Sequence, residues 1–188
     1  MRPMSRRVCG VVLASAVVTG LTLLCWAAPL VPGRAAVPDT WMSLADTKRL
    51  VLSVSRMPQG MTDAGITTEL VADQWKAKLI EAGIEVLDAD TPESADAPVL
   101  QLVVLSGTEP DIPDIMLTVM YATLTQTARF DRLDMSLRVP TYTHPVASME
   151  PKNNLGRSVR DDLDRMIEAF VERLRLADEE MKNLKGGQ

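Results

Sequence analysis

The feature that most constrains this chain is an uncharged run of 24 residues near its start, Val8 to Val31. Arg2, Arg6 and Arg7 precede the run, and no acidic residue occurs before position 37. A basic start followed by an apolar stretch is typical of an export signal and orients the N-terminus toward the cytoplasm. Any globular fold must therefore be built from the residues after position 36.

Two interpretations of residues 1–36 stay open, a cleaved signal peptide and an uncleaved signal anchor. Gly33, Arg34 and Ala35 resemble a small-residue cleavage site, and the nearby prolines would break a helix. The apolar run is nevertheless long enough to approach the roughly 20 residues that span a bilayer. Cys25 follows Leu24, which is not the small residue that a lipid-modified cysteine requires. We therefore predict export to the periplasm or the outer side of the membrane, with residues 8–31 as the only membrane contact if the leader stays.

Both cysteines, Cys9 and Cys25, lie inside the leader. The exported domain thus has no disulfide, no cysteine ligand for a metal and no cysteine nucleophile. About 150 residues can bury roughly two-thirds of their unfolded surface, so a hydrophobic core alone can hold such a domain together.

The exported part is acidic. The leader carries four positive charges of a whole-chain net charge of −5, which leaves residues 37–188 at −9. Affinity for nucleic acid depends on clustered lysine and arginine, and anionic lipid surfaces attract the same residues. The charge therefore argues against nucleic acid and against peripheral lipid binding.

The first half of the exported part predicts a linker, a strand and a helix. Residues 37–47 are predicted to be a linker, although Trp41, Met42 and Leu44 give it some reason to dock. Residues 48–56 alternate as in a strand. Residues 67–82 place apolar side chains on one helical face, with Gly83 placed to end the helix. The members of that face are Leu70, Val71, Trp75, Leu79 and Ala82.

Extended segments follow. A short strand near residues 84–86 precedes a polar loop over 88–98. Residues 99–106 are almost continuously apolar, which predicts a strand that is covered on both faces. Residues 115–130 and 132–142 are rich in β-formers and flank a charged turn, so we expect an antiparallel hairpin.

The last element is an amphipathic helix with an apolar stripe spaced at three and four residues. The stripe consists of Val159, Leu163, Met166, Ile167, Phe170 and Leu174. Residues 178–188 are predicted to be a frayed tail, which leaves an α+β domain over 48–177. The element order β-α-β-β-β-β-α predicts a single two-layer sandwich with a mostly antiparallel sheet and both helices on one face.

His144 is the only histidine, and it lies just after the expected end of a strand. A general base needs an orienting partner and a nucleophile, and the sequence signals neither. A lone histidine before Pro145 is typical of a strand-end surface residue. We therefore assign no catalytic residue, and the chain is expected not to be an enzyme.

Two acidic loops invite a calcium interpretation. One contains Asp88, Asp90, Glu93 and Asp96, and the other contains Glu109, Asp111 and Asp114. The first has no glycine and the second is stiffened by prolines, so neither matches a calcium loop. We assign no metal and no cofactor.

Trp75 and the methionines Met116, Met120 and Met135 are apolar candidates for a binding surface. Trp75 lies on the apolar face of a predicted helix, which favours a core position. Methionines most often fill gaps in a core, although they also occur on adaptable contact surfaces.

The succession of a strand, a helix that ends in AGIEVLD, the strand PVLQLVVLS, a long hairpin and a closing helix resembles small exported bacterial envelope domains. The N-terminal domain of the Tol-system propeller protein and the auxiliary lipoproteins of ABC-type transporters have this build. The resemblance spans residues 48–177, rests on topology and implies no site residue. It implies a non-enzymatic role in binding or assembly.

The sequence thus favours a non-catalytic cell-envelope module that contacts another envelope protein through a sheet face or a strand edge. The alternative is a small periplasmic hydrolase or ligand-binding protein that uses His144 and the acidic loops. A flat apolar patch would favour the first hypothesis, and a pocket that joins His144 to a serine or a carboxylate would favour the second.

Overall fold

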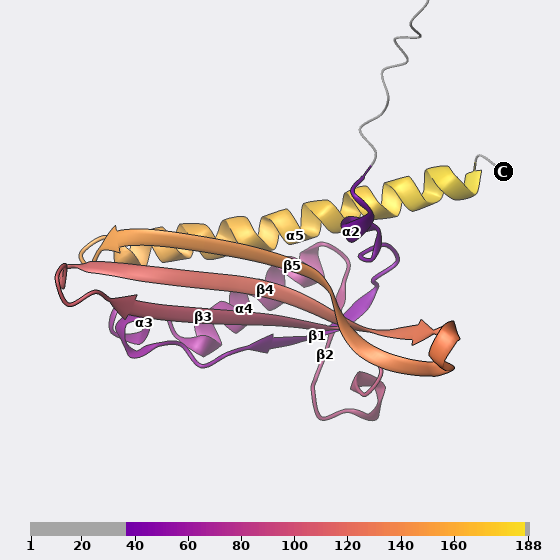
Figure 1. Ribbon diagram of the computed structural model, residues 1–188, viewed down its shortest axis with the longest axis horizontal. Coiled ribbons are helices and arrows are strands. Elements are labelled where there is room, and N and C mark those ends of the chain that lie inside the picture. Colours follow the sequence, from indigo (N-terminus) through magenta and orange to yellow (C-terminus); the bar gives the residue numbers. More distant parts are fainter. Residues whose placement is uncertain (1–36, 187–188) are drawn as a thin grey trace, which may run out of the picture. The chain divides into compact units, whose positions relative to one another are not determined.

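The computed structural model describes residues 37–186, so the predicted leader lies outside the described residues. Within that part, five strands form one sheet in the order β2-β1-β3-β4-β5 (Figure 1). Their bounds are β1 (Arg49–Val54), β2 (Glu85–Leu87), β3 (Val99–Thr108), β4 (Ile115–Phe130) and β5 (Met135–Pro151). β1 pairs parallel with β2 and β3, whereas β3–β4 and β4–β5 are antiparallel. The predicted α+β class with a mostly antiparallel sheet is confirmed.

Two long helices, α4 (Thr68–Glu81) and α5 (Leu155–Gly186), cover one face of this sheet (Figure 1). The short helices α2 (Asp39–Met42) and α3 (Gln59–Asp63) and the 3-10 turns η1 (Pro92–Ser94) and η2 (Asp131–Leu133) complete the described elements. We call the helix-covered face the inner face and the opposite one the outer face.

Helix α4 begins where the sequence predicts. The Thr67 hydroxyl accepts a hydrogen bond from the Leu70 amide at 3.2 Å, which satisfies one of the free donors of the first turn. Val71, Trp75 and Leu79 are buried, so Trp75 is a core residue. Leu70 was expected on the same face but is 40% exposed. Gly83 has a φ of +80°, a conformation that favours glycine after a helix end.

Helix α5 buries its whole predicted stripe, and Phe170 has no exposed surface. The helix continues to Gly186, so residues 178–186 are helical where a frayed tail was expected. Asp178 explains part of this extension. Its carboxylate accepts hydrogen bonds from the Asp46 amide at 2.6 Å and from the Lys48 ammonium at 3.1 Å.

The segment predicted as a linker, residues 37–47, is packed against β5 and α5. Leu44 is completely buried, and the Ser43 hydroxyl donates to the Thr141 carbonyl at 3.0 Å. Trp41 lies on α2 against the Arg173 guanidinium of α5. Of the three apolar residues noted in the sequence, Leu44 belongs to the core, whereas Trp41 and Met42 are partly exposed.

Strands β5 and β3 differ from expectation. β5 was expected over 132–142 but runs to Pro151, because Pro145 lies inside an edge strand and does not end it. His144 therefore lies within the edge strand, where it pairs with Ala122 of β4. β3 was expected to be covered on both faces, yet Leu105 on the outer face is 54% exposed. The continuous apolar run in the sequence therefore did not reveal that only one face of β3 is buried.

Candidate functional site

A groove follows the outer edge of the sheet, between β5 and α5. The inner side of β5 presents His144, Val146, Ser148 and Glu150, which alternate along the strand. Facing it is an α5 stripe spaced at four, three, four and four residues, consisting of Ser158, Asp162, Arg165, Ala169 and Arg173. Most of these residues line a cavity of about 480 Å³, which we call the β5–α5 groove.

Arg173 organises one end of the groove. Its Nη1 donates to the Tyr142 hydroxyl at 2.6 Å and lies 2.9 Å from His144 Nδ1. Its guanidinium carbon is 5.0 Å from the centre of the Trp41 ring and 5.7 Å from that of Tyr142, within the range of cation–π attraction. Because a guanidinium can only donate, His144 Nδ1 must be the acceptor, which fixes a neutral imidazole.

The surroundings keep His144 uncharged. Burial lowers the pKa of the imidazole below its ordinary value, and the positive charge of Arg173 lowers it further. Burial also raises the pKa of the Tyr142 hydroxyl, while the hydrogen bond and charge of Arg173 act in the opposite direction. His144 is thus a half-buried acceptor inside β5, whereas the sequence indicated a surface residue at the end of a strand.

This lowered pKa predicts a pH dependence of stability. As pH falls from about 7.5 to about 5.5, unfolded chains take up a proton on histidine before folded ones do, so the free energy of unfolding should decrease. In His144→Gln this part of the decrease should vanish, because glutamine does not titrate. Urea unfolding of both proteins at the two pH values measures the difference. A variant with the same pH slope as the parent would show that His144 titrates normally.

His144 does not lie next to a serine or a carboxylate of the groove. Ser148 is four residues further along β5, about 13 Å away at the usual rise of a strand. Asp162 precedes Arg173 by eleven residues, about 16 Å along a helix. His144 therefore shares the groove with a serine and carboxylates that lie far beyond hydrogen-bonding reach. Its direct polar neighbour is Arg173, which cannot act as a nucleophile.

The opposite end of the groove holds a buried carboxylate. Asp162 is only 3% exposed, and one of its oxygens accepts a hydrogen bond from Arg165. The other oxygen, Oδ2, has no hydrogen-bond partner among the described residues, and neither has the buried Ser148 hydroxyl. A buried acceptor without a donor costs about 1–3 kcal/mol, so the groove is polar and incompletely satisfied here.

The two acidic loops remain apart from this groove. Ser94 ties the first loop together by donating to the Ala89 and Thr91 carbonyls, and Asp88 lies 3.9 Å from Lys76. In the part of the chain that the structure describes, no three histidine, cysteine or acidic side chains are placed to hold a metal ion.

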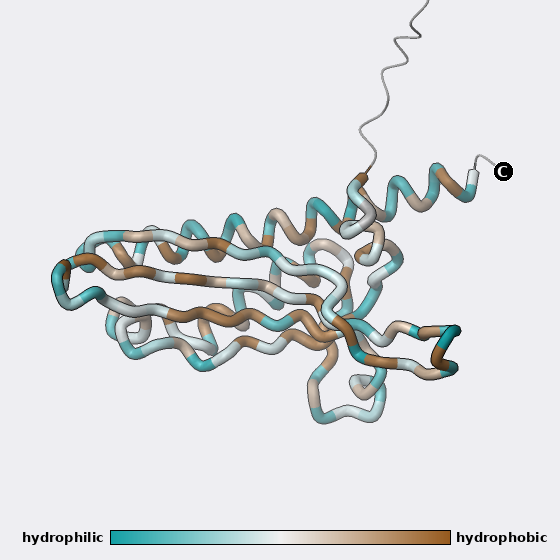
Figure 2. The backbone as a smooth tube through the Cα atoms, viewed as in Figure 1, coloured by the Kyte–Doolittle hydropathy of each residue, from teal (hydrophilic) through white to brown (hydrophobic). Residues whose placement is uncertain are grey.

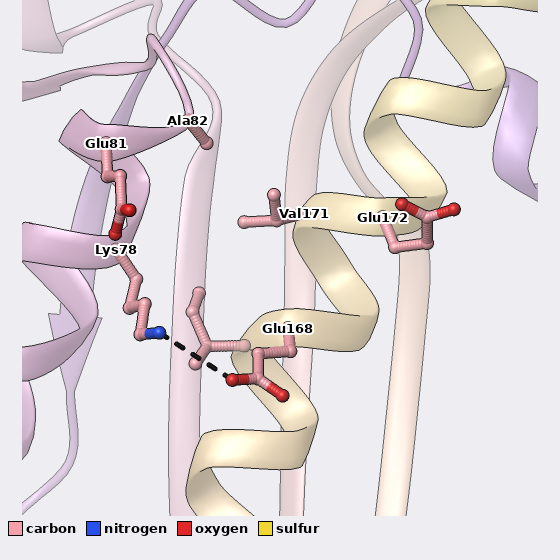
Figure 3. Close-up of a pocket in the computed structure, with 7 residues that line it drawn as sticks. Lys78, Glu81, Ala82, Glu168, Val171 and Glu172 are labelled. Atoms are coloured by element: carbon pink, nitrogen blue, oxygen red, sulfur yellow. Dashed lines mark ion pairs between the residues drawn. The ribbon is translucent and has the colours of Figure 1, made fainter.

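A second cleft, of about 340 Å³, lies between α4 and α5 (Figure 3). Lys78 reaches across it to Glu168, with Nζ and Oε1 3.6 Å apart. Both side chains are about half exposed, so this ion pair contributes little. Ala82 and Val171 contribute apolar surface beside Glu172, and the arrangement amounts to an ordinary helix–helix contact.

The β4–β5 hairpin continues past the body of the sheet as a two-stranded arm, residues 125–140 (Figure 1). A bulge between Leu124 and Thr125 marks its start. Several apolar side chains of the arm are 39–52% exposed, namely Phe130, Leu133, Met135 and Leu137. On the opposite side of the arm, Arg138 donates to the Ala95 and Ala97 carbonyls at 3.3 and 2.9 Å. The arm is thus held by its polar side and displays its apolar side.

The outer face of the sheet is also apolar. Figure 2 shows hydrophobic residues along β3 and β4. No charged residue occurs at the outer positions of the sheet's last three strands, which follow from strand alternation. These positions lie within residues 99–107 of β3, 117–123 of β4 and 143–149 of β5. Leu117 is 46% and Met149 61% exposed, and with Ile112 they line a hollow of about 360 Å³. Solvent faces of antiparallel sheets are usually polar, so this face is suited to a covering partner.

The methionines are divided between the two roles that the sequence left open. Met120 is fully buried in the core, and Met116 is partly buried against it. Met135 is 44% exposed on the arm, where an adaptable side chain suits a contact surface.

No protein-family model and no curated protein matches the sequence. Among solved structures, the chain is similar to a minor lipoprotein from Acinetobacter baumannii at 15% identity and a TM-score of 0.33, covering 72% of this chain and 93% of that one. It is also similar to the rare lipoprotein B from Shewanella oneidensis at 15% identity and a TM-score of 0.20, covering 74% and 95%. At these TM-scores the similarity supports no inference about a site.

Among residues 37–186, no helix is both long enough and apolar enough to cross a membrane. Even α5, with 32 residues, carries charged residues along its whole length.

Proposed function

We propose that this chain is a non-catalytic, exported module of the cell envelope that binds another envelope protein through its arm. The observation that carries the proposal is the exposed apolar side of residues 125–140. An isolated two-stranded hairpin is at best marginally stable in water, and exposed apolar patches of this kind mark contact sites.

The arm extends the inner face of the sheet beyond its helices. Met120 and Leu124 point into the core, and by alternation along the same strand Ala128 and Phe130 lie on the same side. On β5, Leu137 pairs with Ala128 and Met135 with Phe130, so they share that side. The partner would cover the part of this face that α4 and α5 leave open.

The export signal supports an envelope location, because the basic and apolar leader precedes a domain without cysteine. The acidic balance of residues 37–188 supports a protein partner over nucleic acid or an anionic lipid surface. Of the two alternatives to this role, the hydrolase gains no support from the surroundings of His144, because its direct polar neighbour is Arg173. Ligand binding in the β5–α5 groove is favoured by the unpartnered oxygen of Asp162.

A photo-crosslinking amino acid at Leu133 tests the proposed function in the native host. Leu133 is 52% exposed on the arm, and Leu184 near the end of α5 is 56% exposed and serves as the matched control. We expect one discrete protein adduct from position 133 and none from position 184. The proposal fails if position 133 yields no adduct, or if both positions yield the same adducts.

A further inference from the structure

We infer that the β5–α5 groove binds an extended segment of a second protein, which adds to the β5 edge and places a lysine or arginine side chain against Asp162 and Glu150. This inference rests on the proposed function, since it names a second contact for a protein-binding module. It uses a surface that is separate from the arm.

One edge of the sheet, that of β5, is free. β5 is the last strand, and Pro145 within it has no N–H to donate to β4. In a regular antiparallel pair the backbone of Pro145 must therefore face the edge, and so must the backbones of Ala147 and Met149, which share its alternation. Among the described residues, no other strand pairs with this edge.

Only a short length of this edge is open to a partner. Ser43 already donates to the Thr141 carbonyl, and Trp41 and Thr143 line the same cavity. Pro145 and Pro151 lack donors at either end of the remaining stretch. Ala147 and Met149 between them each offer one N–H and one C=O, which suits a short added strand. The prolines restrict pairing to this window and protect the rest of the edge from aggregation.

The groove below that window carries a negative charge. Side chains of an added strand alternate, so every second one would point between β5 and α5. At this end the groove contains Glu150, Asp162 and Arg165, so one carboxylate is in excess, and only one Asp162 oxygen is satisfied, by Arg165. The other oxygen needs a donor, and an ammonium or a guanidinium supplies one with a complementary charge.

A second copy of the chain does not suit the groove as its occupant. A second β5 would bring its own Ser148 and Glu150 into the groove, and a second glutamate beside Asp162 and Glu150 would be repelled. At the other end Arg173 would repel a basic side chain. The basic residue of the bound segment therefore lies at the Glu150 end.

The test begins with selection of a phage-displayed library of random nonapeptides on the full chain in detergent. We expect the enriched peptides to share an arginine or lysine among β-forming residues. A synthetic enriched peptide is then measured by fluorescence anisotropy with the parent and with variants. Asp162→Asn keeps the shape and removes the charge, and Ala147→Pro removes one edge N–H at a position equivalent to that of Pro145.

Each of these two variants should weaken peptide binding roughly ten-fold or more, the usual cost of losing a charged or backbone hydrogen bond in a protected site. Asp164→Asn, an exposed acid on the same helix, is the matched control and should bind as the parent does. If Ala147→Pro does not fold, Asp162→Asn alone decides. No enriched sequence, or full binding by Asp162→Asn, would overturn the inference.

Replacement of Phe130 and Leu137 on the arm by serine separates this inference from the proposed function. A protein with a substituted arm should still bind the peptide, because the groove is intact. Conversely, loss of the groove contact would leave the crosslink from Leu133 in place.

Discussion

Replacing Phe170 with alanine should lower the free energy of unfolding by about 3–5 kcal/mol. Phe170 is completely buried at the centre of the α5 stripe, and its ring packs edge-on against Tyr142 with centroids 5.5 Å apart. The domain has no disulfide to compensate. A domain of this size has about 5–15 kcal/mol of stability in total, so the loss should be severe.

The measurement is a thermal melt or a urea titration beside the parent, with an expected decrease in melting temperature of roughly 6–20 °C. Leu184→Ala is the matched control, because Leu184 lies on the same helix but is 56% exposed. It should change stability by no more than about 0.5 kcal/mol. A Phe170→Ala protein that melts within a degree or two of the parent would mean that α5 does not cover the core.

The two long helices were predictable from the sequence, α4 mainly from its end signals and α5 from its periodic apolar stripe. Thr67 caps α4 and Gly83 ends it. The apolar stripe around Phe170 is long enough to identify α5 as a helix. The hairpin was also predictable, since its two strands are rich in β-formers.

The bounds of β5 were not predictable, because Pro145 normally ends a strand and is tolerated here only at a sheet edge. Edge position depends on strand order, which a single sequence does not encode locally. The fate of residues 37–47 depends on similar long-range contacts, in which Ser43 reaches Thr141.

The candidate site was less visible in the sequence than the fold. His144 was noticed, but its partner Arg173 lies 29 residues away and is brought near by the packing of α5 on β5. Asp162 carried a signal that was overlooked. It lies directly before Leu163 at the border of the apolar stripe, where a buried carboxylate needs a partner. The exposed side of the arm had no signal, because its alternation resembles that of a covered strand.

Substituting Phe130 and Leu137 together by serine should weaken capture of the protein that crosslinks to the arm at least about ten-fold. Both side chains lie on the apolar side and are about 40% exposed, so their loss should cost the domain little stability. A single apolar anchor at the centre of an interface often contributes about 2 kcal/mol or more, so loss of even one of the two should weaken binding at least about ten-fold. Leu70→Ser with Ile80→Ser, two exposed apolar positions on α4, is the matched control.

The most direct test of protein binding through the arm is co-purification from native membranes. The measured quantity is the amount of the crosslinked partner that is recovered with the parent, the arm variant and the α4 control. Equal melting temperatures of the three proteins establish that each is folded. We predict the same recovery with the parent and the α4 control, and at least a ten-fold loss with Phe130→Ser/Leu137→Ser. Recovery at the parental level with the arm variant would contradict the account.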